Sequence, residues 1–182
     1  SFFLMAPAAG ALPDVAGRGF PADSLGEIPR GERGDCATAI AMAEHRGCDT
    51  VIVDSYAAGA SYLGEMRSAG LRVISISDEA NGPSQAHMLI NGGAHAGEFG
   101  YRSAHGDTRF LLGLRYALLQ SEFRDCPRRE VSGSVDRVLL SIGGDDPRNL
   151  MPRLIKLLGS VLARGSALDV VVGPFFRNRD AL

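Results

Sequence analysis

Four polar side chains lie at or just past the ends of apolar runs in this 182-residue chain: Asp54, Tyr56, Asp78 and Asn91. Ligands of open parallel sheets bind outside the carboxyl ends of the strands, so this placement predicts a binding site. Asp54 and Asp78 could act as general bases or hold sugar hydroxyls, and Tyr56 could donate a hydrogen bond or a proton to a leaving oxygen. The alternative is that each aspartate only caps the helix after its strand.

A glycine turn forms the second candidate site, because Gly143 and Gly144 separate an apolar run from a helical pattern. Glycines allow positive φ and close approach of a ligand to the main chain, and the N–H groups of the next helix can bind an anion. Asp145 or Asp146 would cap this helix, with Pro147 in its first turn. Two carboxylates would repel a phosphate unless they face away or bind a sugar hydroxyl. The turn is therefore either part of a ligand cleft or a plain connection with good caps.

Strand-like and helix-like patterns alternate along the chain and must position these residues. We expect strands at 1–5, 50–54, 72–78, 87–91, 109–112, 138–142 and 167–174, helices at 34–45, 60–68 and 150–158, and a helix or turn at 10–19. The alternation predicts an α/β fold with a parallel sheet. Residues 92–107 form a polar, glycine-rich loop, and Tyr62 and Tyr101 are predicted to be core or rim aromatics.

A polar segment at 124–134 divides the pattern into two parts. We expect an N-terminal Rossmann-like domain at 1–126, a linker at 127–136 and the start of a second, C-terminal Rossmann-like domain at 137–182. Two strands and one helix cannot close the second domain, and the apolar residues 1–6 resemble a strand cut from something longer. The chain is therefore expected to be incomplete at both ends or completed by a partner chain, with a homo-oligomer as the other possibility.

The composition is that of an ordinary globular protein, with 45% hydrophobic and 22% charged residues, which excludes disordered and fibrous classes. The net charge of -2 gives no basic surface for nucleic acid, and no apolar stretch approaches the roughly 20 residues of a membrane span. Cys36, Cys48 and Cys126 form no CxxC pair, and the histidines lack metal-ligand spacing. A cytoplasmic protein with reduced thiols and no metal is the resulting prediction.

Four segments occur in a fixed order: Asp54-Ser55-Tyr56, Ile76-Ser77-Asp78-Glu79, residues 113–123 and residues 142–150. Together they resemble the UDP-sugar hydrolases of pseudaminic acid biosynthesis and the related spore-coat polysaccharide proteins. The resemblance covers nearly the whole chain. Its most specific part is the Tyr-Ala-Leu-Leu…Glu-Phe segment that begins at Tyr116, followed by the Gly-Gly-Asp-Asp-Pro turn.

This resemblance implies a glycosyltransferase-B type architecture, in which the second Rossmann-like domain holds most of the nucleotide. The family reaction needs no metal or other cofactor. Water attacks the anomeric carbon of a UDP-linked diacetamido-trideoxyhexose, and UDP leaves, stabilised by backbone donors and helix dipoles. The resemblance places Tyr56 at the reacting end, with Asp54 orienting it or a water molecule. The residues that would bind the UDP-sugar substrate are Asp78, Asn91, Gly143, Gly144, Asp145 and Asn149.

The chain departs from the family pattern at several positions. Family members carry Gly-x-Gly-His followed by an arginine, which supplies the general base, and this chain has no such motif. Ser55 stands where the family has histidine, and Glu79 stands where it has the second of two aspartates. The glycine-rich loop with a uridine-binding glutamate would lie beyond Leu182. We therefore do not expect this chain alone to perform the full reaction.

Three classes of function remain open from the sequence. The first is a nucleotide-sugar hydrolase of bacterial surface-sugar biosynthesis, recognisable by the histidine motif in a longer chain. The second is a glycosyltransferase of the same fold in an envelope or secondary-metabolite pathway, which the departures at Ser55 and Glu79 permit. The third is a non-catalytic nucleotide-sugar-binding module completed by a partner, which an exposed apolar sheet edge would favour.

Overall fold

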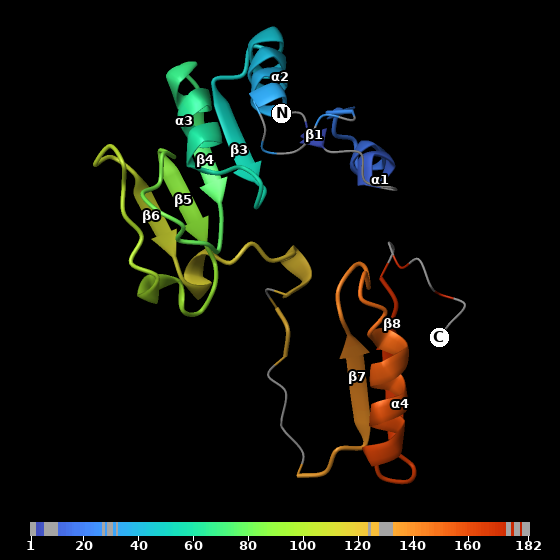
Figure 1. Cartoon of the computed structure of the whole chain (residues 1–182). Helices are drawn as coiled ribbons and strands as arrows, with labels where there is room; N and C mark the ends of the chain where they lie inside the picture. Colours follow the sequence, from blue (N-terminus) through green and yellow to red (C-terminus); the bar gives the residue numbers. More distant parts are fainter. Residues whose placement is uncertain are drawn as a thin grey trace. The chain divides into compact units, whose positions relative to one another are not determined.

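A computed structural model of the chain describes residues 3–5, 11–26, 28, 31, 33–123, 125–127, 133–173, 176 and 179. It divides into two compact units, residues 1–124 and 125–182, which are described separately (Figure 1). Both units are α/β with parallel strands. Parts of the predicted strands at 1–5 and 167–174, and of the predicted linker at 127–136, lie outside the described residues.

The first unit contains a four-stranded parallel sheet in chain order. Its strands are β3 (Thr50–Asp54), β4 (Arg72–Ile76), β5 (Met88–Asn91) and β6 (Arg109–Leu112). All three strand pairs are parallel, which confirms the sheet type predicted from the alternating pattern. The carboxyl ends of the four strands therefore meet along one edge of the sheet.

Two helices bury one face of this sheet: α2 (Arg33–His45) and α3 (Ala60–Ser68). Tyr62, Leu63 and Met66 recur at helical spacing on α3 and pack in one cluster with Val73 of β4. Burying an apolar side chain of this size contributes about 1.5–3 kcal/mol before the cost of ordering it. Helix α3 ends at Ser68, and Gly70, two residues later, reverses the chain with a φ of +84° that strains other residues.

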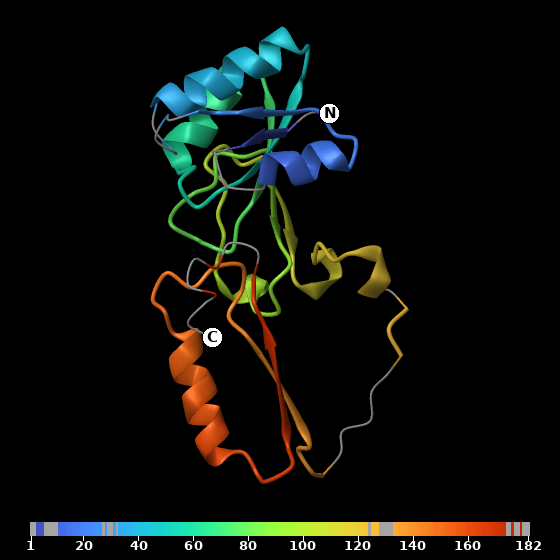
Figure 2. The same ribbon diagram turned by 90° about the vertical axis from the view of Figure 1, so that its right-hand side faces the viewer.

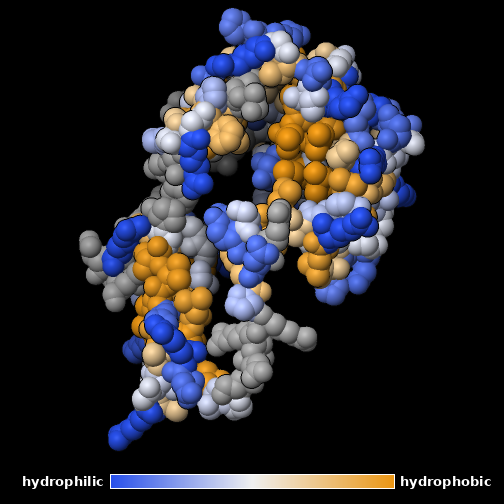
Figure 3. All heavy atoms as spheres, turned by 180° about the vertical axis from the view of Figure 1, so that it is seen from behind, coloured by the Kyte–Doolittle hydropathy of each residue, from blue (hydrophilic) through white to orange (hydrophobic). Residues whose placement is uncertain are grey.

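The opposite face of the same sheet carries apolar side chains outside that cluster. Ile52, Ile74, Ile76 and Ile90 lie on it by register, and Ile52 is 66% exposed. The space-filling view shows apolar atoms gathered over the first unit (Figure 3). Parallel sheets are usually covered by helices on both faces. Helices α2 and α3 cover only one face of this sheet.

A second, smaller parallel sheet in the first unit pairs β1 (Phe3–Met5) with β2 (Ala22–Ser24) across α1 (Ala11–Gly17) (Figure 2). An ion pair between Asp23 and Arg46 joins β2 to the turn after α2. Short 3-10 turns occupy Ala96–Glu98, Leu114–Tyr116 and Ser121–Phe123.

The second unit is a β-α-β arrangement of β7 (Arg137–Ser141), α4 (Met151–Val161) and β8 (Ala167–Val171), with the two strands parallel. Arg137 and Asp169 form an ion pair across them. Helix α4 has Pro152 in its first turn, so the prediction that Pro147 would stand there is wrong. Among the described residues of both units, no helix combines the length and apolar character needed to cross a membrane.

Candidate functional site

The carboxyl edge of the four-stranded sheet brings together the four polar residues singled out in the sequence. They line a pocket of about 200 Å³, whose walls are Asp54, Ser55, Tyr56, Ile76, Ser77, Asp78, Ile90, Asn91 and Gly92. These residues follow or end β3, β4 and β5, because parallel strands deliver their carboxyl ends to the same place. The pocket joins two carboxylates, a phenol and a carboxamide around one small space.

Tyr56 and Asp78 are joined directly within this pocket. The Tyr56 hydroxyl donates a hydrogen bond to Asp78 Oδ2 at 3.2 Å. That bond, with the negative charge of the same carboxylate, raises the pKa of Tyr56 above its ordinary value, and the phenol is protonated at neutral pH as tyrosines ordinarily are. The Tyr56 oxygen and the second oxygen of Asp78 then remain as hydrogen-bond acceptors.

Asp54 borders the same pocket and does not cap a helix. Helix α3, the next along the chain, has Gly59 at its N-cap and no side-chain cap. The structure therefore overturns the capping alternative for Asp54. Tyr56 hydrogen-bonds to Asp78 and not to Asp54, so the expectation that Asp54 orients the phenol lacks a direct contact.

Asn91 forms the buried floor of the pocket and is 4% exposed. Its carboxamide is held by the Gly93 N–H and by the hydroxyl of Tyr101. Sequence reasoning missed this partner, since Tyr101 lies in the polar loop after β5 and carries no local signal of a role. The next residue, Gly92, is required by packing, because a Cβ there would lie 2.5 Å from the Ala117 Cα.

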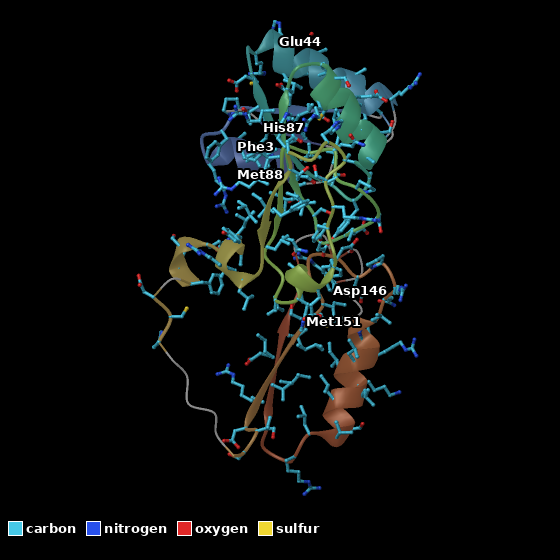
Figure 4. The ribbon with its side chains drawn as sticks, turned by 90° about the vertical axis from the view of Figure 1, so that its left-hand side faces the viewer. Phe3, Glu44, His87, Met88, Asp146 and Met151 are labelled. Carbon is cyan, nitrogen blue, oxygen red and sulfur yellow. The ribbon has the colours of Figure 1, made fainter. Side chains whose placement is uncertain are left out.

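The glycine turn of the second unit is organised by Asp146. Its Oδ1 accepts the Leu150 N–H at 2.8 Å, and its Oδ2 accepts the Met151 N–H at 2.7 Å. Figure 4 shows Asp146 and Met151 together at the start of α4. These N–H groups are therefore not free for an anion. Neither carboxylate proposed as the cap stands at the N-cap, which is Leu150; Asp146 instead accepts the first N–H groups of the helix from outside it, and Asp145 accepts the backbone N–H of Asp146.

Two further residues predicted in the turn, Gly143 and Asn149, have an unusual backbone conformation. Gly143 has a φ of +93° and Asn149 a φ of +52°, so both adopt the left-handed region. A Cβ at Gly143 would meet nothing within 4 Å, whereas one at Gly173 would lie 2.4 Å from the Gly143 oxygen and 2.5 Å from the Gly144 oxygen. The backbone of Gly173 therefore packs closely against Gly143 and Gly144.

A larger hollow of about 540 Å³ lies along α3 and includes Glu65, Arg67, Gln85 and His105. Two of its polar groups are engaged within the protein. Arg67 pairs with Asp107, and His105 Nε2 lies 2.7 Å from Gln85 Oε1. We place the candidate site at the smaller pocket, since the residues that line it include two aspartates and the phenol of Tyr56.

The described residues contain no group of three or more His, Cys, Asp or Glu side chains arranged to hold a metal ion. Neither protein-family models nor curated proteins gave a match to the chain.

Proposed function

We propose that the chain is part of a nucleotide-sugar hydrolase that acts at the anomeric carbon of a UDP-sugar and releases UDP. The observation that carries this proposal is the Tyr56–Asp78 hydrogen bond, made by exposed side chains that line a small pocket at the carboxyl edge of a parallel sheet. The sequence resemblance to UDP-sugar hydrolases supports the choice of reaction and a glycosyltransferase-B type arrangement.

The size of the pocket supports a sugar as the group bound there. Its volume of about 200 Å³ is below the roughly 300–1,000 Å³ of sites that enclose a whole drug-sized ligand. One sugar ring is therefore a better match than an entire nucleotide sugar. In this proposal the sugar hydroxyls bind the acceptors of Tyr56 and Asp78, and the nucleotide binds outside this pocket.

The chemistry then needs one proton acceptor. A water oxygen forms the new bond to the anomeric carbon, and the bond from that carbon to the phosphate oxygen breaks with its electron pair passing to UDP. Asp54 borders the pocket and makes no side-chain hydrogen bond within the described part of the chain. We assign its carboxylate as the acceptor of the water proton, with Tyr56 and Asp78 holding the sugar in place.

Isothermal titration with UDP, GDP, CDP and UDP-N-acetylglucosamine tests the proposal. We expect binding selective for the two uridine ligands, and release of UDP from the nucleotide sugar by a longer chain that includes these residues. Transfer of the sugar to a hydroxyl acceptor in place of water would favour the glycosyltransferase alternative. Absence of binding to all four ligands would overturn the proposal.

Tyr56→Phe tests the role of the pocket in the reaction. Loss of the hydroxyl should lower turnover far more than affinity for UDP, because in this proposal the phenol binds the sugar most strongly in the transition state and does not contact the nucleotide. Steady-state kinetics and UDP titration of the same preparation measure the two quantities. Tyr116→Phe is the matched control, as another tyrosine of the first unit outside the pocket. Unchanged turnover in Tyr56→Phe would remove this residue from the mechanism.

A further inference from the structure

The floor of the pocket is a side-chain amide whose two ends are both fixed. Asn91 Oδ1 accepts the Gly93 N–H at 2.8 Å, and Asn91 Nδ2 donates to the Tyr101 hydroxyl at 2.9 Å. A primary amide has two N–H donors, and Tyr101 takes one of them. Within the described residues, no acceptor is found for the other. Since the amide is planar, fixing its oxygen and one N–H also fixes the direction of the second.

Tyr101 is itself held on three sides. Its ring packs edge-on against Phe99, with centroids 5.9 Å apart, and stacks on Phe110 of β6 at 6.1 Å. Its hydroxyl donates to the carbonyl oxygen of Ser77 at 3.4 Å. Ser77 follows β4 and lines the same pocket as Asn91. One hydroxyl therefore joins the ends of β4 and β5 beneath the site.

We infer that Tyr101 is a positioning residue, which holds the Asn91 carboxamide so that its second N–H binds an oxygen of the sugar. The inference rests on the proposed function and deepens it. It identifies the group recognised at the pocket floor as a neutral hydrogen-bond acceptor, a hydroxyl or amide carbonyl oxygen on the sugar. Tyr101 acts through Asn91 and does not touch the ligand.

Tyr101→Phe keeps the aromatic packing and removes only the hydroxyl. We expect affinity for UDP-N-acetylglucosamine to fall about tenfold, the equivalent of one well-oriented hydrogen bond, while affinity for UDP stays unchanged. Isothermal titration of both ligands measures this difference, and circular dichroism checks that the variant is folded. Tyr116→Phe, the same change at another half-buried tyrosine of the first unit, should leave both affinities unchanged.

A double-mutant cycle tests whether Tyr101 acts through Asn91. Asn91→Ala should lose the same preference for the nucleotide sugar, and adding Tyr101→Phe to it should have no further effect. A further tenfold loss in the double variant, or an equal loss for UDP and the nucleotide sugar in Tyr101→Phe, would overturn the inference. Wild-type affinities in Tyr101→Phe would also overturn it and leave the proposed function standing. If the unsubstituted chain binds neither ligand, the proposed function fails, and the inference falls with it.

Discussion

At the scale of single residues, Asp146 gives the clearest stability prediction. Its carboxylate accepts two backbone N–H groups at the start of α4, at 2.8 and 2.7 Å. Asp146→Ala should therefore lower the free energy of unfolding of the second unit by about 1–2 kcal/mol, the usual cost of losing a good cap. Asp146→Asn keeps one acceptor oxygen and should lose less. Urea unfolding followed by circular dichroism measures both variants, and an equal loss in the two would contradict the capping explanation.

The same turn shows which residue roles a sequence can predict. Gly143 was expected to have a positive φ, and it does. Pro147 was expected in the first turn of the helix. The helix begins later, at Met151, whose N–H donates to Asp146, and Pro152 therefore stands in its first turn. The close approach of Gly173 and the Tyr101–Asn91 contact could not be predicted, since both join segments distant along the chain.

At the scale of elements, we expect His87 to make the stability of the β4–β5 pairing depend on pH. The Val73 N–H donates to His87 Nδ1 at 3.1 Å, so the ring must be neutral at that nitrogen. Partial burial lowers the pKa of His87; nearby Arg67, Arg72 and His105 lower it too, and Asp107 opposes them. The unfolded chain therefore takes up this proton first as pH falls. We expect full stability above about pH 6.5 and a progressive loss below it.

The pH dependence is measured as urea unfolding midpoints between pH 7.5 and 5, for the unsubstituted chain and for His87→Asn. The Asn oxygen can accept from the Val73 N–H but does not titrate, so this variant should lose less stability on acidification. Because the two proteins share every other ionisable group, only the difference between the two curves reports on His87. Parallel curves would show that His87 is not the cause of the loss of stability on acidification.

The elements themselves were predictable where local pattern decides them. Thr50–Asp54 and Ala60–Ser68 were expected with the bounds observed, because a short apolar run that ends in a carboxylate and a helical pattern that ends before Gly70 are strong signals. The strand Ala22–Ser24 was not predicted. It has three residues, one of them charged, and it is a strand only because β1 pairs with it.

At the scale of the whole molecule, both units present apolar side chains to solvent on sheet residues. Ile52 in the middle of β3 is 66% exposed, and Leu139 in the middle of β7 is 68% exposed. Strand β3 is the edge of its sheet, and exposed apolar edge strands favour association. The parallel α/β class could be predicted from the alternating pattern. Which sheet face stays uncovered depends on how helices pack, which the sequence pattern does not specify.

We therefore expect the chain to self-associate as its concentration rises, and Ile52→Thr to weaken that association. Threonine suits a strand and removes apolar surface, so the free energy of unfolding should change by no more than about 0.5 kcal/mol. Val53→Thr is the matched control: Val53 packs against the buried cluster on the other face, so this variant should lose about 1 kcal/mol or more and associate as before. Sedimentation velocity over a concentration series, with urea unfolding of the same samples, measures both effects. A chain that stays monomeric throughout, or an Ile52→Thr variant that associates like the unsubstituted protein, would show that the exposed face of β3 does not drive association.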